Sequence, residues 1–305
     1  MYYLAQTNNP NPDLNQVIIK NEKLDFYSII YPNLGASIQK LRSHGIEIID
    51  GIENSDEGLN TYKNRYNSSF LFPFPGRIPN GKYSFNNVDY ALDCNETGAN
   101  NSLHGHIHNK KFSFQPQEIT EKKAIVKFTY SDTGAKGFPF SYHIEIIYTF
   151  THKKLIIEFT VSNNSNIEFP FGIGWHPYFK TTDLSESLLS FQSEHQYLLN
   201  ENLVPERKIP INYTSPLFVK ETLLDDCFII KKSEVSFKTQ EYNMNIAFSS
   251  KPSNRFLQVY TPPSRSGIAI EPMTCIGNCF NNKIGLQILE PNNTYNWQIN
   301  LEYSF

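Results

Sequence analysis

Three segments between residues 122 and 163 constrain the fold more than any other part of the chain. They read KKAIVKFTY, YHIEIIYTF and LIIEFTVSN, and they are rich in β-branched and aromatic residues. Such side chains favour β-strands because they suit a pleated, half-buried surface. The turn Thr151–Lys154, which joins the second segment to the third, is so short that these strands are expected to pair antiparallel.

The rest of the chain continues this pattern. Residues 16–50 read as short strands separated by turns, and the closing segments LQILEP and YNWQINLEYSF are interpreted as a final hairpin. Aromatic residues make up 14% of the chain, which again favours strands over helices. The sequence therefore predicts an all-β fold, a large antiparallel β-sandwich with few short helices. No linker or internal repeat divides it, so residues 1–305 are expected to form a single domain.

Charge and cysteine content narrow the classes of partner. The net charge is −3, and no cluster of Lys or Arg forms a stripe that would neutralise a nucleic-acid backbone. The N-terminus lacks the features of a signal peptide, and no stretch approaches the ~18 apolar residues of a membrane span. We therefore expect a cytoplasmic protein with no nucleic-acid or membrane partner.

Four scattered cysteines indicate reduced thiols, and the pair Cys275 and Cys279 lacks the second pair that a zinc site would need.

The segment FPFGIGWHPYFK, Phe169 to Lys180, places one histidine among large aromatic residues. Gly172 and Gly174 allow the backbone to bend or to approach another group closely. Pro177 keeps His176 out of a helix and in an extended or turn conformation. An imidazole fixed in this way has a proton to exchange, and the neighbouring rings are suited to flank an apolar ligand face. The alternative is a core histidine whose hydrogen bond goes to a backbone carbonyl.

Two loops carry further candidates. Residues 64–85 read as a shaped loop that leads into a hairpin at Asn80-Gly81, and Arg77 projects from its base. A guanidinium held there suits a carboxylate, a phosphate or sugar hydroxyls, but on this loop alone the simpler interpretation is a surface arginine paired with an acid. In the segment NNSLHGHIH, alternate histidines would share one face of a straight strand and suggest a metal. Gly105 instead favours a turn, with His104 pointing into a cavity and His106 and His108 solvated.

Carboxylates occur in two apolar strands. LLDDCFII contains Asp225 and Asp226, of which one is expected to turn inward and to need a partner. The segment GIAIE ends at Glu271, directly before Pro272. Partial desolvation there would raise the pKa of the carboxyl and make it a better base near neutral pH.

Taken in their order, these pieces resemble the aldose 1-epimerases, the mutarotases of the galactose-mutarotase-like β-sandwich group. The matching pieces span nearly the whole chain: GRIPNGKYSF, LHG, the FPF and GWHPYF strand pair, an Asp-x-Cys-Phe stretch, a strand ending in Glu-Pro, and Leu-x-Pro before a C-terminal strand. The resemblance implies a galactose mutarotase-like supersandwich. In one departure, His106 stands where the family often has a second glycine after LHG.

The resemblance also implies a reaction and roles for five residues. Glu271 would be the general base and His176 the general acid in the interconversion of α and β anomers of free hexoses such as glucose or galactose. His104, Arg77 and Asp225 would bind the sugar. Upward tuning of both pKa values would leave Glu271 ionised and His176 protonated at neutral pH. Such an isomerase needs a small-molecule sugar substrate and no cofactor.

Two alternatives stay open from the sequence. A hexose 6-phosphate mutarotase on the same fold would need extra cations, for which Lys63, Arg65, Lys110 and Lys111 are candidates. A carbohydrate-binding protein without turnover is the other, because a fold does not fix a function. The sequence leaves the oligomeric state open.

Overall fold

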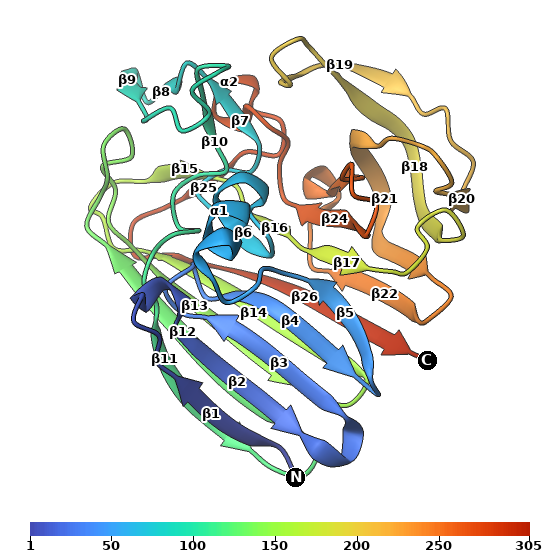
Figure 1. Cartoon of the computed structure of the whole chain (residues 1–305). Coiled ribbons are helices and arrows are strands. Elements are labelled where there is room, and N and C mark those ends of the chain that lie inside the picture. The colour runs from blue at the N-terminus through green and yellow to red at the C-terminus, as the bar shows by residue number, and fades with distance from the viewer.

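The computed structural model describes all 305 residues, and antiparallel strands in two facing layers dominate it (Figure 1). Five N-terminal strands form the first layer: β1 (Tyr3–Thr7), β2 (Gln16–Asn21), β3 (Phe26–Tyr31), β4 (Ser37–Ser43) and β5 (Ile46–Asp50). The second layer contains β11 (Ser113–Ile119), β12 (Ala124–Asp132), β13 (Tyr142–Phe150), β14 (Lys154–Asn163) and the C-terminal β26 (Thr294–Ser304). The predicted all-β sandwich is therefore confirmed.

Alternating side chains build the core between the layers. In β14, the side chains of Leu155, Ile157, Phe159 and Val161 point inward and are buried, as a period of two requires. The Tyr148 hydroxyl in the second layer donates to the backbone carbonyl of Ala36 beside the first, at 2.7 Å. One continuous cluster of buried apolar side chains runs from the first strand region to the last strand. The N- and C-terminal segments thus share one core.

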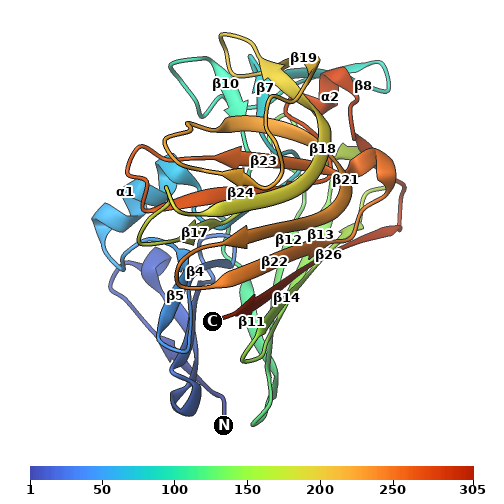
Figure 2. The same ribbon diagram turned by 90° about the vertical axis from the view of Figure 1, so that its right-hand side faces the viewer.

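A third group of strands crosses one end of the sandwich and closes it (Figure 2). It consists of β17 (Tyr178–Lys180), β18 (Leu188–Leu199), β19 (Pro205–Pro210), β20 (Leu217–Phe218), β21 (Asp225–Lys238), β22 (Asn243–Phe248), β23 (Phe256–Tyr260) and β24 (Gly267–Met273). Strand β17 pairs with β5 on one side and with β24 on the other. Strand β22 pairs with β26, which in turn pairs with β14. These pairings join both layers through the end strands into one continuous sheet.

Shorter elements lie above this end of the sandwich. They are β6 (Ser69–Leu71), β7 (Arg77–Pro79), β8 (Lys82–Phe85), β9 (Val88–Ala91), β10 (Asn101–Leu103), β15 (Phe169–Phe171), β16 (Gly174–His176) and β25 (Gln287–Leu289), with the helices α1 (Asp56–Arg65) and α2 (Cys279–Asn282) and three 3-10 turns (Pro12–Leu14, Glu22–Leu24 and Pro252–Asn254). Strands β7 and β10 pair with each other, as do β8 and β9. Neither α-helix has the length and apolar character that crossing a bilayer requires.

The structure corrects one expected pairing. The segments LQILEP and YNWQINLEYSF do not form a final hairpin, because β25 pairs with β15 in a small sheet of its own. Strand β26 instead inserts between β14 and β22. The hairpin prediction was wrong because the partners of both strands, β15 for β25 and β14 and β22 for β26, lie far away in the sequence.

Candidate active site

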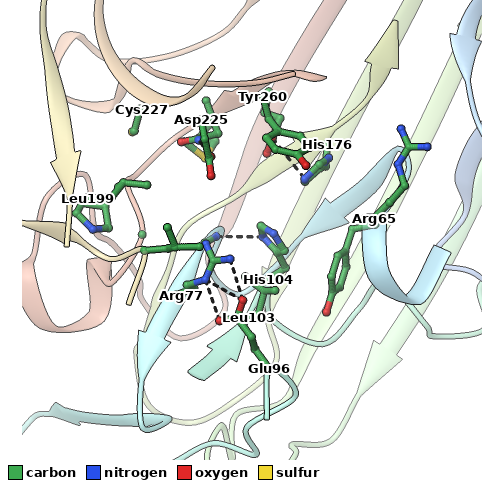
Figure 3. A pocket seen from close by; sticks show the side chains of 18 of the residues that line it. Arg65, Arg77, Glu96, Leu103, His104, His176, Leu199, Asp225, Cys227 and Tyr260 are labelled. Atoms are coloured by element: carbon green, nitrogen blue, oxygen red, sulfur yellow. Dashed lines mark hydrogen bonds and ion pairs between the residues drawn. The ribbon is translucent and has the colours of Figure 1, made fainter. Parts of the chain in front are cut away.

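A cavity of about 320 Å³ opens where the crossing strands meet the short elements above them. All five residues that the sequence singled out line it: Arg77, His104, His176, Asp225 and Glu271. Its floor is one face of β21, β23 and β24. The register places Cys227 opposite Gln258 and Gln258 opposite Glu271, so alternate residues of three neighbouring strands point into the same space. Figure 3 shows how the labelled side chains surround it.

His176 and Glu271 form the centre of the site. The imidazole Nε2 lies 3.4 Å from Glu271 Oε1, and the two residues are only 7% and 2% exposed. His176 ends β16, beside β6 and just before Pro177, and the backbone N–H of Ser68 donates to its carbonyl. Its Nδ1 is buried and has no hydrogen-bond partner. His176 lines the cavity and its imidazole is paired with the Glu271 carboxyl, so it is not a core histidine remote from the site.

Gly172 explains how this segment reaches its place. A Cβ at residue 172 would lie 2.1 Å from the Sγ of Cys275, which no side chain allows. The close approach that the glycine-rich segment predicted is therefore between the β15–β16 connection and the chain that follows β24. The neighbouring pairing of Gly174 with Met273 joins β16, which carries His176, to β24, which carries Glu271.

Burial shifts the two pKa values in opposite directions. It raises the pKa of the Glu271 carboxyl well above its ordinary value, and the Asp225 carboxylate raises it further. Burial lowers the pKa of His176 to about 4. The expectation that tuning would raise both values is thus wrong for the histidine, because desolvation disfavours the charged form of each group. Between the two pKa values the pair holds one proton and no net charge.

His104 occupies a strained position that fixes its ring. It follows the last residue of β10 with φ +62°, and Gly105 continues the turn with φ +66°. The backbone N–H of His104 donates to the Gly76 carbonyl at 2.9 Å, and the Gly76 N–H donates to the imidazole Nδ1 at 3.1 Å. Because burial lowers the pKa of His104, the ring is neutral and its proton lies on Nε2. His104 therefore offers the cavity one hydrogen-bond donor.

Arg77 is held by an ion pair at the wall of the cavity. Its Nε and Nη2 donate to Glu96, each with a contact of 2.8 Å, and Asn101 donates to the same carboxylate at 2.8 Å. Burial alone would raise the pKa of Glu96, but Arg77 and Asn101 hold it below the ordinary value. Both interpretations of Arg77 thus apply: it is paired with an acid, and it lines the cavity with the Nη1 side of its fork unused by Glu96.

The structure distinguishes the two adjacent aspartates. Asp225 lines the cavity, and its Oδ1 accepts a hydrogen bond of 2.8 Å from Gln258. Asp226 points to the opposite face of β21, where Gln196 and Tyr213 donate to it. Burial raises the pKa of Asp225, and Arg77 and Gln258 oppose that shift. Asp225 is therefore the acid that faces the site.

The histidines after His104 are not solvated as expected. His106 Nε2 lies 3.1 Å from the Tyr142 hydroxyl, and the His108 ring packs edge-on against Tyr66 at 4.9 Å. Both are largely enclosed, and burial lowers the pKa of each to about 4. No group of three or more His, Cys, Asp or Glu side chains is arranged to hold a metal ion, and the four cysteines are free thiols.

Several cavity residues were not predicted as site residues. Glu96, Gln258, Tyr66, Tyr178 and Tyr260 all line the site. Side chains alternate along β24, so Glu271 indicates which face of that strand lines the cavity. Gln258 could not be identified in this way, because its position in the site depends on the pairing of β23 with β24. Of the four cations considered for a phosphate, Arg65 lines the cavity, whereas Lys63, Lys110 and Lys111 do not.

Comparisons with known proteins agree with this architecture. The galactose mutarotase-like protein of Clostridium acetobutylicum superimposes with a TM-score of 0.86 over 99% of this chain and 98% of its own, at 19% identity. The galactose 1-epimerase of Lactobacillus acidophilus gives 0.78 over 100% and 98%, at 17% identity. At such identities these likenesses show the fold.

The sequence comparisons identify the family. The uncharacterized protein YihR of Escherichia coli strain K12 is 25% identical over 233 residues, which cover 72% of this chain and 73% of that protein. The sequence model of the aldose 1-epimerase family matches residues 16–302. The match covers nearly the whole sandwich and every residue of the cavity described above, and on that basis the chain belongs to the aldose 1-epimerase family.

Proposed function

We propose that this protein is a mutarotase that interconverts the α and β anomers of free hexoses such as glucose or galactose. Family membership supports the reaction class. The observation that carries the proposal is the pair of Glu271 Oε1 and His176 Nε2, 3.4 Å apart and almost fully buried in the wall of one cavity. A volume of about 320 Å³ is near the lower end of the roughly 300–1,000 Å³ of ligand pockets, and it suits a single sugar ring.

The reaction needs one base and one acid. Glu271 removes the proton from the anomeric hydroxyl O1 while the C1–O5 bond breaks, and His176 delivers a proton to the ring oxygen O5. The open-chain aldehyde then rotates about the C1–C2 bond. Closure reverses both proton transfers on the other face of C1. Each positioned group typically contributes roughly 10²- to 10⁴-fold in rate, and the protons balance without a cofactor.

The resting proton of the pair fits this scheme. Because both groups are buried, the neutral form of the pair is favoured, with the proton on Glu271 and the imidazole of His176 uncharged. Transfer of that proton from Glu271 to His176 produces the carboxylate and imidazolium that ring opening requires. Hydroxyl groups of a bound sugar stabilise this charged form because they donate to the carboxylate and accept from the imidazolium. The pair therefore needs no proton from water to begin a cycle.

The other groups of the site would hold the ring. The His104 Nε2–H and the free side of the Arg77 fork are donors, and the Asp225 carboxylate is an acceptor. Donors and acceptors on separate walls suit a ring that carries hydroxyls around its edge. Their placement is fixed by the Gly76, Glu96 and Gln258 contacts, so the site is preorganised.

Polarimetry tests the proposal. Fresh α-D-glucose and α-D-galactose should reach their equilibrium rotation faster in proportion to the protein added. If no sugar is accelerated while calorimetry shows that sugars bind, the protein is a carbohydrate-binding protein and the proposed activity is wrong.

A further inference from the structure

Asn101 is a buried residue whose side chain contacts two of the cavity walls. It is 1% exposed and does not line the cavity itself. Its Nδ2 donates to the Glu96 carboxylate at 2.8 Å and to the backbone carbonyl of Asn202 at 3.3 Å. An asparagine amide carries two N–H donors, so each wall receives one of them. Any effect of Asn101 on a bound sugar is therefore exerted through these two partners.

The first partner, Glu96, orients Arg77. Arg77 Nε donates to Glu96 Oε2 and Arg77 Nη2 donates to Oε1, both at 2.8 Å (Figure 3). Asn101 donates to the same Oε2 that Nε contacts. Charge-assisted hydrogen bonds of this kind are directional, so the third donor fixes the plane of the carboxylate and with it the plane of the guanidinium. The Nη1 side of the fork, which Glu96 does not use, is thereby kept in one orientation.

Backbone pairing closes these contacts into a ring. The Glu96 N–H donates to the Asn101 carbonyl at 3.1 Å, and the Asn101 N–H donates to the Glu96 carbonyl at 3.2 Å. In the pairing of β10 with β7, Asn101 lies opposite Pro79 and Leu103 lies opposite Arg77. The path from Arg77 through Glu96 and Asn101 therefore returns to Arg77 through β7 itself. Such a closed set of contacts leaves the guanidinium little independent movement.

The second partner lies in the hairpin tip between β18 and β19, residues 199–205. The tip has a defined shape, because the Asn200 Oδ1 accepts from the backbone N–H groups of Asn202 and Val204 at 3.0 and 3.1 Å. The hydrogen bond from Asn101 to Asn202 joins the tip to β10 and, through it, to Arg77. Three side chains of the tip line the cavity: Leu199, Leu203 and Pro205.

We propose that Asn101 is a positioning residue for sugar binding, which holds Arg77 and the hairpin tip in one arrangement around the ring. This inference rests on the proposed mutarotase function and adds to it a residue outside the cavity. The proton transfers are assigned to His176 and Glu271, which lie on other strands, β16 and β24. Loss of the Asn101 amide should therefore weaken sugar binding and leave the chemical step nearly unchanged.

Asn101→Asp tests the role of the amide donor. The substitution keeps the shape of the side chain, but the new carboxyl donates a hydrogen bond only when it is protonated. It would face the Glu96 carboxylate, and two carboxylates that share a site titrate with one raised pKa, a shift that Arg77 opposes in part. Initial rates are measured by polarimetry on the better substrate of glucose and galactose, between about pH 5 and pH 8.

The expected result is a rise in KM that depends on pH. Near pH 8 the donor is absent, so KM should be about tenfold above wild type, with kcat within about threefold. Toward pH 5 the protonated carboxyl donates to Glu96 again, so the ratio of the two KM values should fall toward one. A residue that only supports the fold would give a ratio that does not return at low pH.

Asn100→Asp is the matched control. Asn100 is the exposed neighbour of Asn101, and its Nδ2 donates to Asn80 rather than to a cavity residue. Its φ of +53° is one that aspartate tolerates, so the substitution adds the same charge without new backbone strain. It should leave KM within about twofold of wild type at every pH.

A double-mutant cycle tests whether Asn101 acts through Glu96. Asn101→Ala and Glu96→Ala each should raise KM, and the double variant should raise it by less than the product of the two single increases. The shared step is the orientation of Arg77, which either substitution already releases. Because the cycle uses alanine, it also provides a result if Asn101→Asp fails to fold.

The outcomes separate this proposal from the proposed function. A KM ratio for Asn101→Asp that is constant with pH, or single increases that multiply in the double variant, would overturn the positioning role. So would a fall in kcat as large as the rise in KM. If wild-type protein accelerates no sugar, the mutarotase function itself is wrong, and the same variants then test the positioning role through the Kd of sugar binding in calorimetry.

Discussion

Replacing Glu271 by glutamine separates its chemical role from its structural one. The amide keeps the shape of the side chain but cannot take the O1 proton. Loss of a general base typically costs roughly 10²- to 10⁴-fold in rate. At about 1.4 kcal/mol per decade, that corresponds to about 3–5 kcal/mol in the activation barrier. We expect kcat to fall by this factor in polarimetry on fresh α-D-glucose, while calorimetry still detects sugar binding.

The same substitution should not destabilise the fold. Burial raises the pKa of Glu271 in the folded state, so the folded protein holds this proton more tightly than the unfolded chain does. Wild-type stability therefore falls as the pH rises from the unfolded pKa, near 4.3, toward the raised folded value. The Glu271→Gln variant lacks this dependence of stability on pH. The free energy of unfolding of Glu271→Gln, relative to wild type, should increase with pH in denaturant titrations.

A matched control uses another carboxylate of the cavity. Glu96→Gln removes one charge from the Arg77 ion pair and should raise KM more than it lowers kcat. Near wild-type turnover in Glu271→Gln would refute the assignment of the base. A loss of folded protein in this variant would instead contradict the expectation that the substitution leaves the fold intact.

Three further predictions test the pH range, the orientation of the site and its backbone. The rate should follow a bell-shaped pH profile, because only the singly protonated pair is active. It should fall near pH 4, where His176 takes a second proton, and again where the pH rises through the raised pKa of Glu271 and the last proton is lost. A monotonic profile would contradict the shared proton. Asp225→Ala should raise KM about tenfold or more, because a charged hydrogen-bond acceptor is lost from the site. Asp226→Ala should leave KM within about twofold of wild type. Equal effects of the two variants in steady-state kinetics would show that both aspartates act structurally. Gly105→Ala should lower the free energy of unfolding by more than about 1 kcal/mol, because φ is +66° and the new Cβ would lie 2.1 Å from the Phe72 carbonyl oxygen. Unchanged thermal melting would mean that the His104 turn relaxes freely.

Local sequence patterns were sufficient to identify site residues whose position is set by their own segment. Gly-Trp-His-Pro fixed His176 at a strand end, and the turn signal at Gly105 placed His104 correctly. The face of the sheet to which a side chain points was not predictable where it depends on pairing with a distant strand. Whether Asp225 or Asp226 turns inward is decided by the pairing of β21 with β23 and β18, which no local pattern records.

The electrostatics could not be predicted from the sequence for a related reason. The direction of the pKa shift at His176 depends on how completely distant segments bury the imidazole, and the sequence reveals only that aromatic residues are near it. His106 and His108 looked exposed because their glycine neighbour suggested a loop. Tyr142 and Tyr66, from remote parts of the chain, enclose them.

The insertion of β26 between β14 and β22 has a consequence for synthesis of the protein. Residues 154–162 pair with residues 294–302, so β14 gains its second partner only when a strand far downstream in the chain has been synthesised. Until then, β14 and β22 each present an open row of backbone donors and acceptors beside apolar side chains. Such edges are prone to pair with other chains. Truncation within Thr294–Ser304 should therefore yield aggregates rather than a smaller folded protein.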